Sequence, residues 1–392
     1  MADKRTHKVI GNSMGTLRLY YVTNRKHHGK NRWRPESYGK NFSDDGAENL
    51  RFGKVTVKVD DQQMQKWLNF PVGTARGEGE KLAEYFSRCA QSARVNAFQE
   101  KIDPKAFDHR ESDSQFGSHA MFAELREAMM QSTDVLVYVH GLRVTWHQAV
   151  GSALALQEML NHTEGRNEER RMLVVLFTWP ADGPGIPFLE YKSDRSEARA
   201  SGYAAGRAML KLRDYLASLR DRAKGGEQIC NRDIHLLCHA MGNYVLQNAI
   251  ACMIDFAPGK VLPRLFGHIF LCAADLDDTV LEAGQAMGQV HELARHVSVY
   301  HNGGDTALHL SDYTKGNPER LGTGGSARPS LLHNKIHQID CTPIVRGLVE
   351  HRYFLSGLVN TDIRFSLDGM GHGDPHRRRA RNPTLHNVWT MK

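Results

Sequence analysis

The sequence predicts an α/β protein built on a doubly wound, mostly parallel sheet. From residue 134 onward, short apolar runs alternate with longer segments of helical pattern. Strands that are apolar on both faces are typical of parallel sheets covered by helices on both sides. A tight turn between one such run and the next helix, at 238–242, is typical of the same architecture.

The strands and helices of the predicted core follow from their periodicity. Mainly apolar runs that predict strands lie at 135–139, 172–177, 234–238, 268–273, 296–300 and near 335–340. Helical patterns lie between them, at 146–160, 197–220, 243–254 and 278–288. The helix expected at 197–220 is amphipathic, with an apolar face made of Met209, Leu212, Leu216 and Leu219.

Three segments are expected along the chain. Residues 1–130 form an N-terminal extension, with strands at 17–22 and 55–59, a polar helical segment from residue 71 and a loop at 101–117. Residues 131–365 form the α/β core, and residues 366–392 form a basic tail.

The net charge of +7 is concentrated near the carboxyl terminus. The last 21 residues hold five basic side chains and one acidic side chain, which is more than half of the excess. We expect a solvated tail here, and nucleic acid is an unlikely partner because no basic surface is interleaved with aromatic residues. The chain lacks an apolar stretch of bilayer length and the apolar run of a secretory signal. A cytoplasmic protein without a membrane span is therefore expected.

The six cysteines show no Cys-x-x-Cys spacing, which argues against a metal or redox site. Cys238 and Cys272 fall within expected strands, so buried free thiols are predicted rather than disulfides. No metal and no organic cofactor is expected.

The turn after the strand at 234–238 carries the most informative motif. It contains Cys238-His239-Ala240-Met241-Gly242, where a nucleophile elbow has small-x-Ser-x-Gly. In such an elbow a serine sits on a strained backbone, and its hydroxyl is presented at the top of the sheet. The scaffold for covalent catalysis is therefore predicted, with Ala240 at the nucleophile position. Cys238 and His239 do not replace the serine, because neither is at the apex.

A second motif, His140-Gly141-Leu142, directly follows the first core strand. In this architecture such a loop supplies a backbone N–H to an oxyanion hole. A His-Gly pair alone is a common turn, but its register with the elbow about 100 residues later favours this function. The two expected donors are the N–H groups of Leu142 and Met241.

A loop beginning at Trp179 follows the next strand and contains several turn-forming residues. It would overhang the carboxyl edge of the sheet, where α/β proteins bind ligands. The residues expected to shape a substrate pocket are His140, Gly141, Trp179 and His239.

Asp305 follows the strand at 296–300 in a Gly-Gly-Asp turn. An acid at this place can accept the Nδ1–H of a catalytic histidine and fix its tautomer. Asp275, Asp277 and Asp278 compete for this role, and an aspartate that merely caps its own turn is the structural alternative. Asp305 is favoured because the glycines allow its carboxylate to reach across the sheet edge.

His351 is the favoured general base, because the chain order of nucleophile, acid and histidine is the one this architecture requires. His333 and His337 are the main competitors. His372 and His376 lie in the expected tail and are poor candidates.

Taken together, these motifs resemble the α/β-hydrolase superfamily, and most closely its bacterial branch known as domain of unknown function 900. The matching motifs are Tyr21-Val22-Thr23-Asn24-Arg25, Asn49-Leu50-Arg51-Phe52-Gly53, Val137-Tyr138-Val139-His140-Gly141, Phe177-Thr178-Trp179-Pro180, His239-Ala240-Met241-Gly242-Asn243, Ala273-Ala274-Asp275-Leu276-Asp277 and His351-Arg352-Tyr353. They span most of residues 17–355 in the expected order.

The resemblance implies a serine where this chain has Ala240, an acid at Asp305 and a base at His351. It implies a serine hydrolase of the carboxylesterase or lipase type acting on a small-molecule ester or related acyl substrate. Two interpretations of Ala240 stay open. An engineered or recent Ser→Ala change is preferred over a natural binding module, because drift should have eroded more than one motif.

Overall fold

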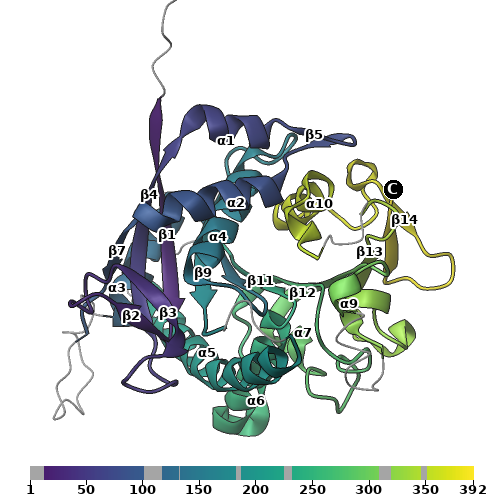
Figure 1. Ribbon diagram of the computed structural model, residues 1–392. Helices are drawn as coiled ribbons and strands as arrows, with labels where there is room; N and C mark the ends of the chain where they lie inside the picture. The colour runs from purple at the N-terminus through teal and green to yellow at the C-terminus, as the bar shows by residue number, and fades with distance from the viewer. Residues whose placement is uncertain are drawn as a thin grey trace, which may run out of the picture.

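One continuous sheet fixes the position of every other element (Figure 1). The computed structural model describes residues 13–100, 117–131, 133–181, 187–224, 232–308, 319–345 and 351–392. The strands of the sheet are β1 (Met14–Thr23), β4 (Arg51–Asp60), β7 (Arg94–Ala97), β8 (Thr133–Val139), β9 (Arg171–Thr178), β10 (Ile234–His239), β11 (Phe266–Cys272), β12 (Ala294–His301), β13 (Ile336–Asp340), β14 (Arg379–Arg381) and β15 (Val388–Met391). They lie in the order β14-β15-β13-β12-β11-β10-β8-β9-β1-β4-β7.

Most neighbouring strands of this sheet are parallel. The run from β15 through β13, β12, β11, β10, β8 and β9 to β1 is parallel throughout. Antiparallel pairs occur at the two sides, between β1, β4 and β7 and between β14 and β15. The predicted α/β class with a doubly wound, mostly parallel sheet is therefore confirmed.

Helices cover both faces of the sheet (Figure 1). Their bounds are α1 (Asp61–Leu68), α2 (Gly79–Cys89), α3 (Gly117–Met130), α4 (Trp146–His162), α5 (Pro187–Lys224), α6 (Gly242–Phe256), α7 (Val290–Leu293), α9 (Leu321–Gly324) and α10 (Gly357–Leu367). Two small hairpins pair β2 (Arg25–His28) with β3 (Ser37–Phe42) and β5 (Pro71–Val72) with β6 (Ala75–Arg76). Short 3₁₀ turns lie at Ala90–Ser92, Pro258–Lys260, Pro329–Leu331, Tyr353–Leu355 and Pro375–Arg377.

Strand β10 shows why the core strands carry apolar side chains on both faces. Side chains alternate between the two faces of a strand. Leu237 accordingly packs in a core with residues of α2, α4 and α10. Its neighbours Leu236 and Cys238 pack in a second core with residues of α3, α5 and α6. Both faces of the sheet are buried, so the strand is mainly apolar, and its two histidines, His235 and His239, are buried as well.

The N-terminal extension is part of the same sheet. Strand β1 pairs in parallel with β9, and it pairs antiparallel with β4 over its whole length. The strands expected at 17–22 and 55–59 are thus present, and the structure lengthens both. The segment expected to be helical from residue 71 contains α2 and α3 but also β7, and 101–116 of the expected loop lies outside the described residues.

The prediction of a solvated basic tail is wrong. Strand β15 pairs with β13, which places residues 388–391 in the central sheet. Arg377 and Arg379 are buried and both form ion pairs with Asp362 of α10, with 3.0 Å between Arg377 Nε and Asp362 Oδ1. Burial alone would raise the pKa of Asp362, but Arg379 and Arg377 hold that pKa below its usual value. Two of the five basic residues of the tail therefore neutralise a buried carboxylate.

The helix expected at 278–288 is also absent, and consecutive turns take its place. The N–H of Glu282 donates to Thr279 O, and the N–H of Gln285 donates to Glu282 O, each at 3.0 Å. Gly284 has a φ of +80°, which interrupts a right-handed helix. A Cβ on Gly288 would lie 2.5 Å from the carbonyl oxygen of Glu282, so this fold-back requires glycine.

Histidines gather toward the amino ends of strands β10 to β13, and two of them, His235 and His268, are buried. His235 pairs in register next to His268, and the His268 ring lies 5.6 Å from that of His296. His235 is 3% exposed, and neither of its ring nitrogens has a hydrogen-bond partner among the residues that the structure describes. Burial lowers the pKa of His235 to about 3. The ring is therefore neutral in the folded protein near neutral pH.

We predict that His235 makes the fold acid-sensitive. The unfolded His235 takes up a proton near pH 6.5, whereas the folded one does so only near pH 3. Its stabilising contribution is therefore complete above pH 6.5 and is lost as the pH falls toward 3. Between pH 7 and pH 5 this loss is about 2 kcal/mol.

The measurement is urea unfolding of the parent and of His235→Leu at both pH values. The variant should lose about 2 kcal/mol less of its free energy of unfolding than the parent. The matched control is His386→Leu at an exposed histidine, which should keep the parental pH dependence. An unchanged pH dependence in His235→Leu would contradict the assignment.

Candidate active site

Ala240 occupies a sharp turn between β10 and α6. Its φ is +48°, in the left-handed region that residues with a side chain rarely adopt. The N–H of Ala240 donates to Cys272 O at 3.0 Å, which ties the turn to β11. A Cβ on Gly242 would lie 2.6 Å from Val139 O, so α6 can start this close to β8 only with glycine. The sequence motif therefore folds into a strained strand-to-helix turn at the carboxyl ends of the parallel strands.

His351 and Asp305 form a hydrogen-bonded pair. His351 Nδ1 lies 2.7 Å from Asp305 Oδ2, and the carboxylate accepts because it has no proton to give. Asp305 is 2% exposed, and its other oxygen accepts the N–H groups of Ala307 and Leu308 at 3.1 and 3.2 Å. Asp305 thus caps its own turn with one oxygen and orients His351 with the other.

The competing acids face other partners. Asp275 Oδ2 accepts the hydroxyl of Tyr191 at 2.8 Å, and Asp275 Oδ1 lies 3.4 Å from Nε of Arg320. Asp277 accepts Nη1 of the same arginine at 2.6 Å. The backbone N–H of Asp278 donates to the carbonyl of Glu319. These contacts hold the loop after β11 and leave Asp305 as the acid that pairs with His351.

The competing histidines are stacked elsewhere. The ring of His333 lies 3.9 Å from that of His291, and the ring of His337 lies 3.7 Å from that of His372. His333 lies just before β13, and His337 lies within β13. His376 is exposed and bonds Asp374.

His239 connects the turn to the segment that carries His351. Its Nε2–H donates to the backbone carbonyl of His351 at 3.0 Å, and the two rings lie 4.7 Å apart. Burial, reinforced by His351, lowers the pKa of His239 well below its usual value. A neutral ring with its proton on Nε2 fits this bond. The sequence predicts His239 in the pocket, and no pattern around it indicates this anchoring contact.

The two expected oxyanion donors carry unused N–H groups. A Cβ on Gly141 would lie 2.9 Å from the Ala240 methyl, so the loop after β8 lies directly against the turn. Within the described ranges, the N–H groups of Leu142 and Met241 have no hydrogen-bond acceptor. Backbone N–H groups inside proteins are rarely left without an acceptor, so these two remain the candidates for binding a ligand oxygen.

His140 supports this loop from behind. It is fully buried, and its Nδ1–H donates to Gly141 O at 2.7 Å while Nε2 accepts from Thr178 Oγ1 at 2.9 Å. Burial, with Arg25 adding to it, lowers the pKa of His140 to about 3, so the ring is neutral. Trp179 stacks on it and is also fully buried. Both side chains, which were expected in the pocket, hold the loop instead of facing open space.

Arg25 also supports the loop after β8, a role that the sequence motifs do not predict. It is 1% exposed, and its guanidinium donates to Val144 O at 2.7 Å, Thr178 Oγ1 at 2.9 Å and Gly39 O at 3.0 Å. Burial lowers its pKa to about 9, which still leaves it cationic at neutral pH. A hydrogen-bond chain thus runs from Arg25 through Thr178 and His140 to Gly141. The available signal was its place at the end of the motif that starts at Tyr21.

No group of three or more metal-binding side chains occurs in the part of the chain that the structure describes. Over the same ranges, no helix combines the length and apolar character needed to cross a bilayer.

The chain matches the family described as alpha/beta hydrolase of unknown function (DUF900) over residues 118–361. This match covers more than half of the chain and includes the turn at Ala240, Asp305 and His351. The protein belongs to this family. Its fold is thus that of an α/β-hydrolase, and the family indicates a hydrolase in general. No curated protein and no solved structure matches the chain.

We predict that Arg25 is essential to the fold around the loop after β8. In Arg25→Met the buried oxygens of Val144, Thr178 and Gly39 lose their donor, so the free energy of unfolding should fall by about 3 kcal/mol. Urea denaturation measures the loss. Arg94→Met, at an exposed arginine of β7, is the matched control and should change stability by less than about 0.5 kcal/mol. Equal effects of the two changes would refute this role of Arg25.

Proposed function

We propose that this hydrolase fold carries the machinery of a serine esterase, with alanine at the nucleophile position. The observation that carries the proposal is the 2.7 Å bond between His351 and Asp305, with the His351 ring packed on the residue before Ala240. An acid, an oriented imidazole and a strained turn are thus brought together at one end of the sheet. This combination supports acyl transfer to water.

The proposed reaction needs a hydroxyl at position 240. A serine Oγ would attack the carbonyl carbon of an ester while His351 Nε2 removes its proton, and Asp305 would hold the proton on Nδ1. The N–H groups of Leu142 and Met241 would stabilise the negative oxygen of the tetrahedral intermediate. His351 would then give its proton to the leaving alcohol, and a water molecule would hydrolyse the acyl-enzyme by the same steps.

With Ala240 the first step has no nucleophile. Removing the nucleophile from such a unit lowers kcat by a factor on the order of 10⁶. The acid–base pair, the free N–H groups and the strained turn are all intact, which supports a recent or engineered Ser→Ala change. Ala240 itself favours the second candidate, a module that binds an ester or another acyl compound without turning it over.

We predict that Ala240→Ser creates a hydrolase. The variant should react covalently with a fluorophosphonate probe and hydrolyse p-nitrophenyl esters, whereas the alanine form should do neither. A panel of esters of graded acyl length would then define the acyl preference. Ala240→Gly, which also lacks a nucleophile, is the control for probe binding without reaction. A serine variant that folds and stays unlabelled would favour the binding module.

The role of Asp305 can be tested in the Ala240→Ser background. Asp305→Asn should lower kcat by a factor on the order of 10⁴, because an amide favours the wrong tautomer of the histidine. Asp277→Asn is the matched control at a half-exposed aspartate that binds Arg320, and it should keep kcat within about threefold of the parent. Steady-state ester hydrolysis at pH 7.5 measures both. A larger loss in Asp277→Asn than in Asp305→Asn would sink the assignment of the acid.

A further inference from the structure

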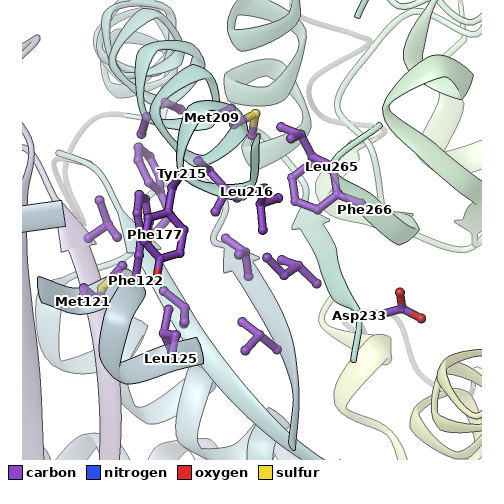
Figure 2. A pocket seen from close by; sticks show the side chains of 18 of the residues that line it. Met121, Phe122, Leu125, Phe177, Met209, Tyr215, Leu216, Asp233, Leu265 and Phe266 are labelled. Carbon is purple, nitrogen blue, oxygen red and sulfur yellow. The ribbon is translucent and has the colours of Figure 1, made fainter. Parts of the chain in front are cut away.

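An apolar cavity of about 500 Å³ lies between the sheet and helices α3, α5 and α6 (Figure 2). Cavities of this size are in the range that encloses small-molecule ligands, and they far exceed the voids of an ordinary core. Neither Ala240, Asp305 nor His351 lines it. The cavity is therefore separate from the proposed esterase site.

The cavity exists because α5 packs closely on α6 only along its first half. A Cβ on Gly202 would lie 2.4 Å from Asn248 Cβ, and one on Gly206 would lie 2.7 Å from Ala249 O. Beyond Gly206 the inner face of α5 carries large side chains. Met209, Leu212 and Leu216 line the cavity and are only half-buried. The amphipathic stripe predicted from the sequence therefore packs against the core only in part, and it also lines this space.

The walls of the cavity are apolar and adaptable. Figure 2 shows Phe122, Phe177 and Tyr215 gathered on one side and Leu265 and Phe266 on the other. Ile234 and Cys238, at the two ends of β10, both line the cavity. At about 3.3 Å per residue, the cavity follows the strand for about 13 Å. This shape and lining suit a single alkyl chain.

The polar lining residues are mainly arginines at one end of the cavity. Arg232 precedes β10, Arg264 precedes β11, and Arg295 is near the start of β12. Because these strands are parallel, all three lie at the amino edge of the sheet, opposite the turn at Ala240. Asp233 forms an ion pair with Arg295. Arg232 and Arg264 have no ion pair or hydrogen bond with other described residues.

We propose that this cavity binds a single-chain anionic amphiphile, namely a fatty acid with its chain along β10 and its carboxylate at Arg232 and Arg264. The alkyl chain matches the apolar walls, and the anionic head matches two arginines that form no ion pair or hydrogen bond with another described residue. This proposal does not depend on the esterase chemistry, because the head group lies at the opposite edge of the sheet.

Titration calorimetry of the full chain with dodecanoate, dodecyl phosphate and dodecanol tests the proposal. Dodecanoate should bind with one molecule per chain and with a negative heat-capacity change. Leu212→Trp fills the cavity and should weaken binding at least tenfold, and Ala208→Phe serves the same purpose if the first variant does not fold. Tighter binding of dodecyl phosphate than of dodecanoate would identify a phosphate head group and overturn the carboxylate.

The charge of the head group has its own test. The double variant Arg232→Gln and Arg264→Gln should weaken dodecanoate binding about tenfold and leave dodecanol binding unchanged. Lys211→Gln, on the exposed side of α5, is the matched control and should alter neither. Absence of saturable dodecanoate binding, or equal affinity in the cavity-filling variants, overturns the site. If the arginine variant loses affinity for dodecanol and for dodecanoate to the same extent, the proposal of an anionic head group is overturned.

Discussion

The left-handed backbone at Ala240 is the constraint on which the proposed site depends. A residue with a side chain pays on the order of 1 kcal/mol for this conformation, so its surroundings must impose it. The Asn243 amide lies within hydrogen-bond distance of the carbonyls of Cys238, Ala240 and Cys272. Gly242 allows the start of α6 to pass next to β8. None of these restraints involves a hydroxyl at position 240, so the turn keeps its shape with alanine.

A second strained residue helps to position the segment that carries the proposed base. Ala273, at the end of β11, has a φ of +47°, and its N–H donates to the hydroxyl of Tyr353 at 2.9 Å. That hydroxyl donates in turn to Tyr300 O at 2.7 Å. Tyr353 therefore fixes the segment of His351 to two strands, while His239 bonds its backbone from the turn. His351, the proposed base, is thus positioned by bonds that tie its segment to the sheet, although this segment comes late in the chain.

Local patterns in the sequence were enough to predict the parallel strands at the centre of the sheet and the turn, but not the strands β7, β14 and β15 at its edges. Apolar runs mark the buried strands, and the Gly242 motif marks the place where a helix starts against a strand. Contacts between distant segments could not be predicted. The tail that the sequence suggests to be solvated pairs with the sheet, and the ion pair of Arg379 with Asp362 links it to the core. The bracing of the loop after β8 by Arg25 links positions more than 100 residues apart. The helix expected at 278–288 is absent. Its apolar residues recur at helical spacing, but the glycines in the segment interrupt the helix, and the prediction gave them too little weight.

Buried arginines also explain why a net charge of +7 is weak evidence for a polyanionic partner. Arg25, Arg320 and Arg364 are among the largest fully buried side chains, and each binds carbonyl or carboxylate oxygens inside the fold. A guanidinium offers five donors in a fixed plane, so it can join several segments at once. Arginines that are buried and bonded inside the fold do not form a surface to which a polyanion could bind. Three arginines at the amino edge of the sheet line one end of the apolar cavity, where the proposed amphiphile would place its anionic head.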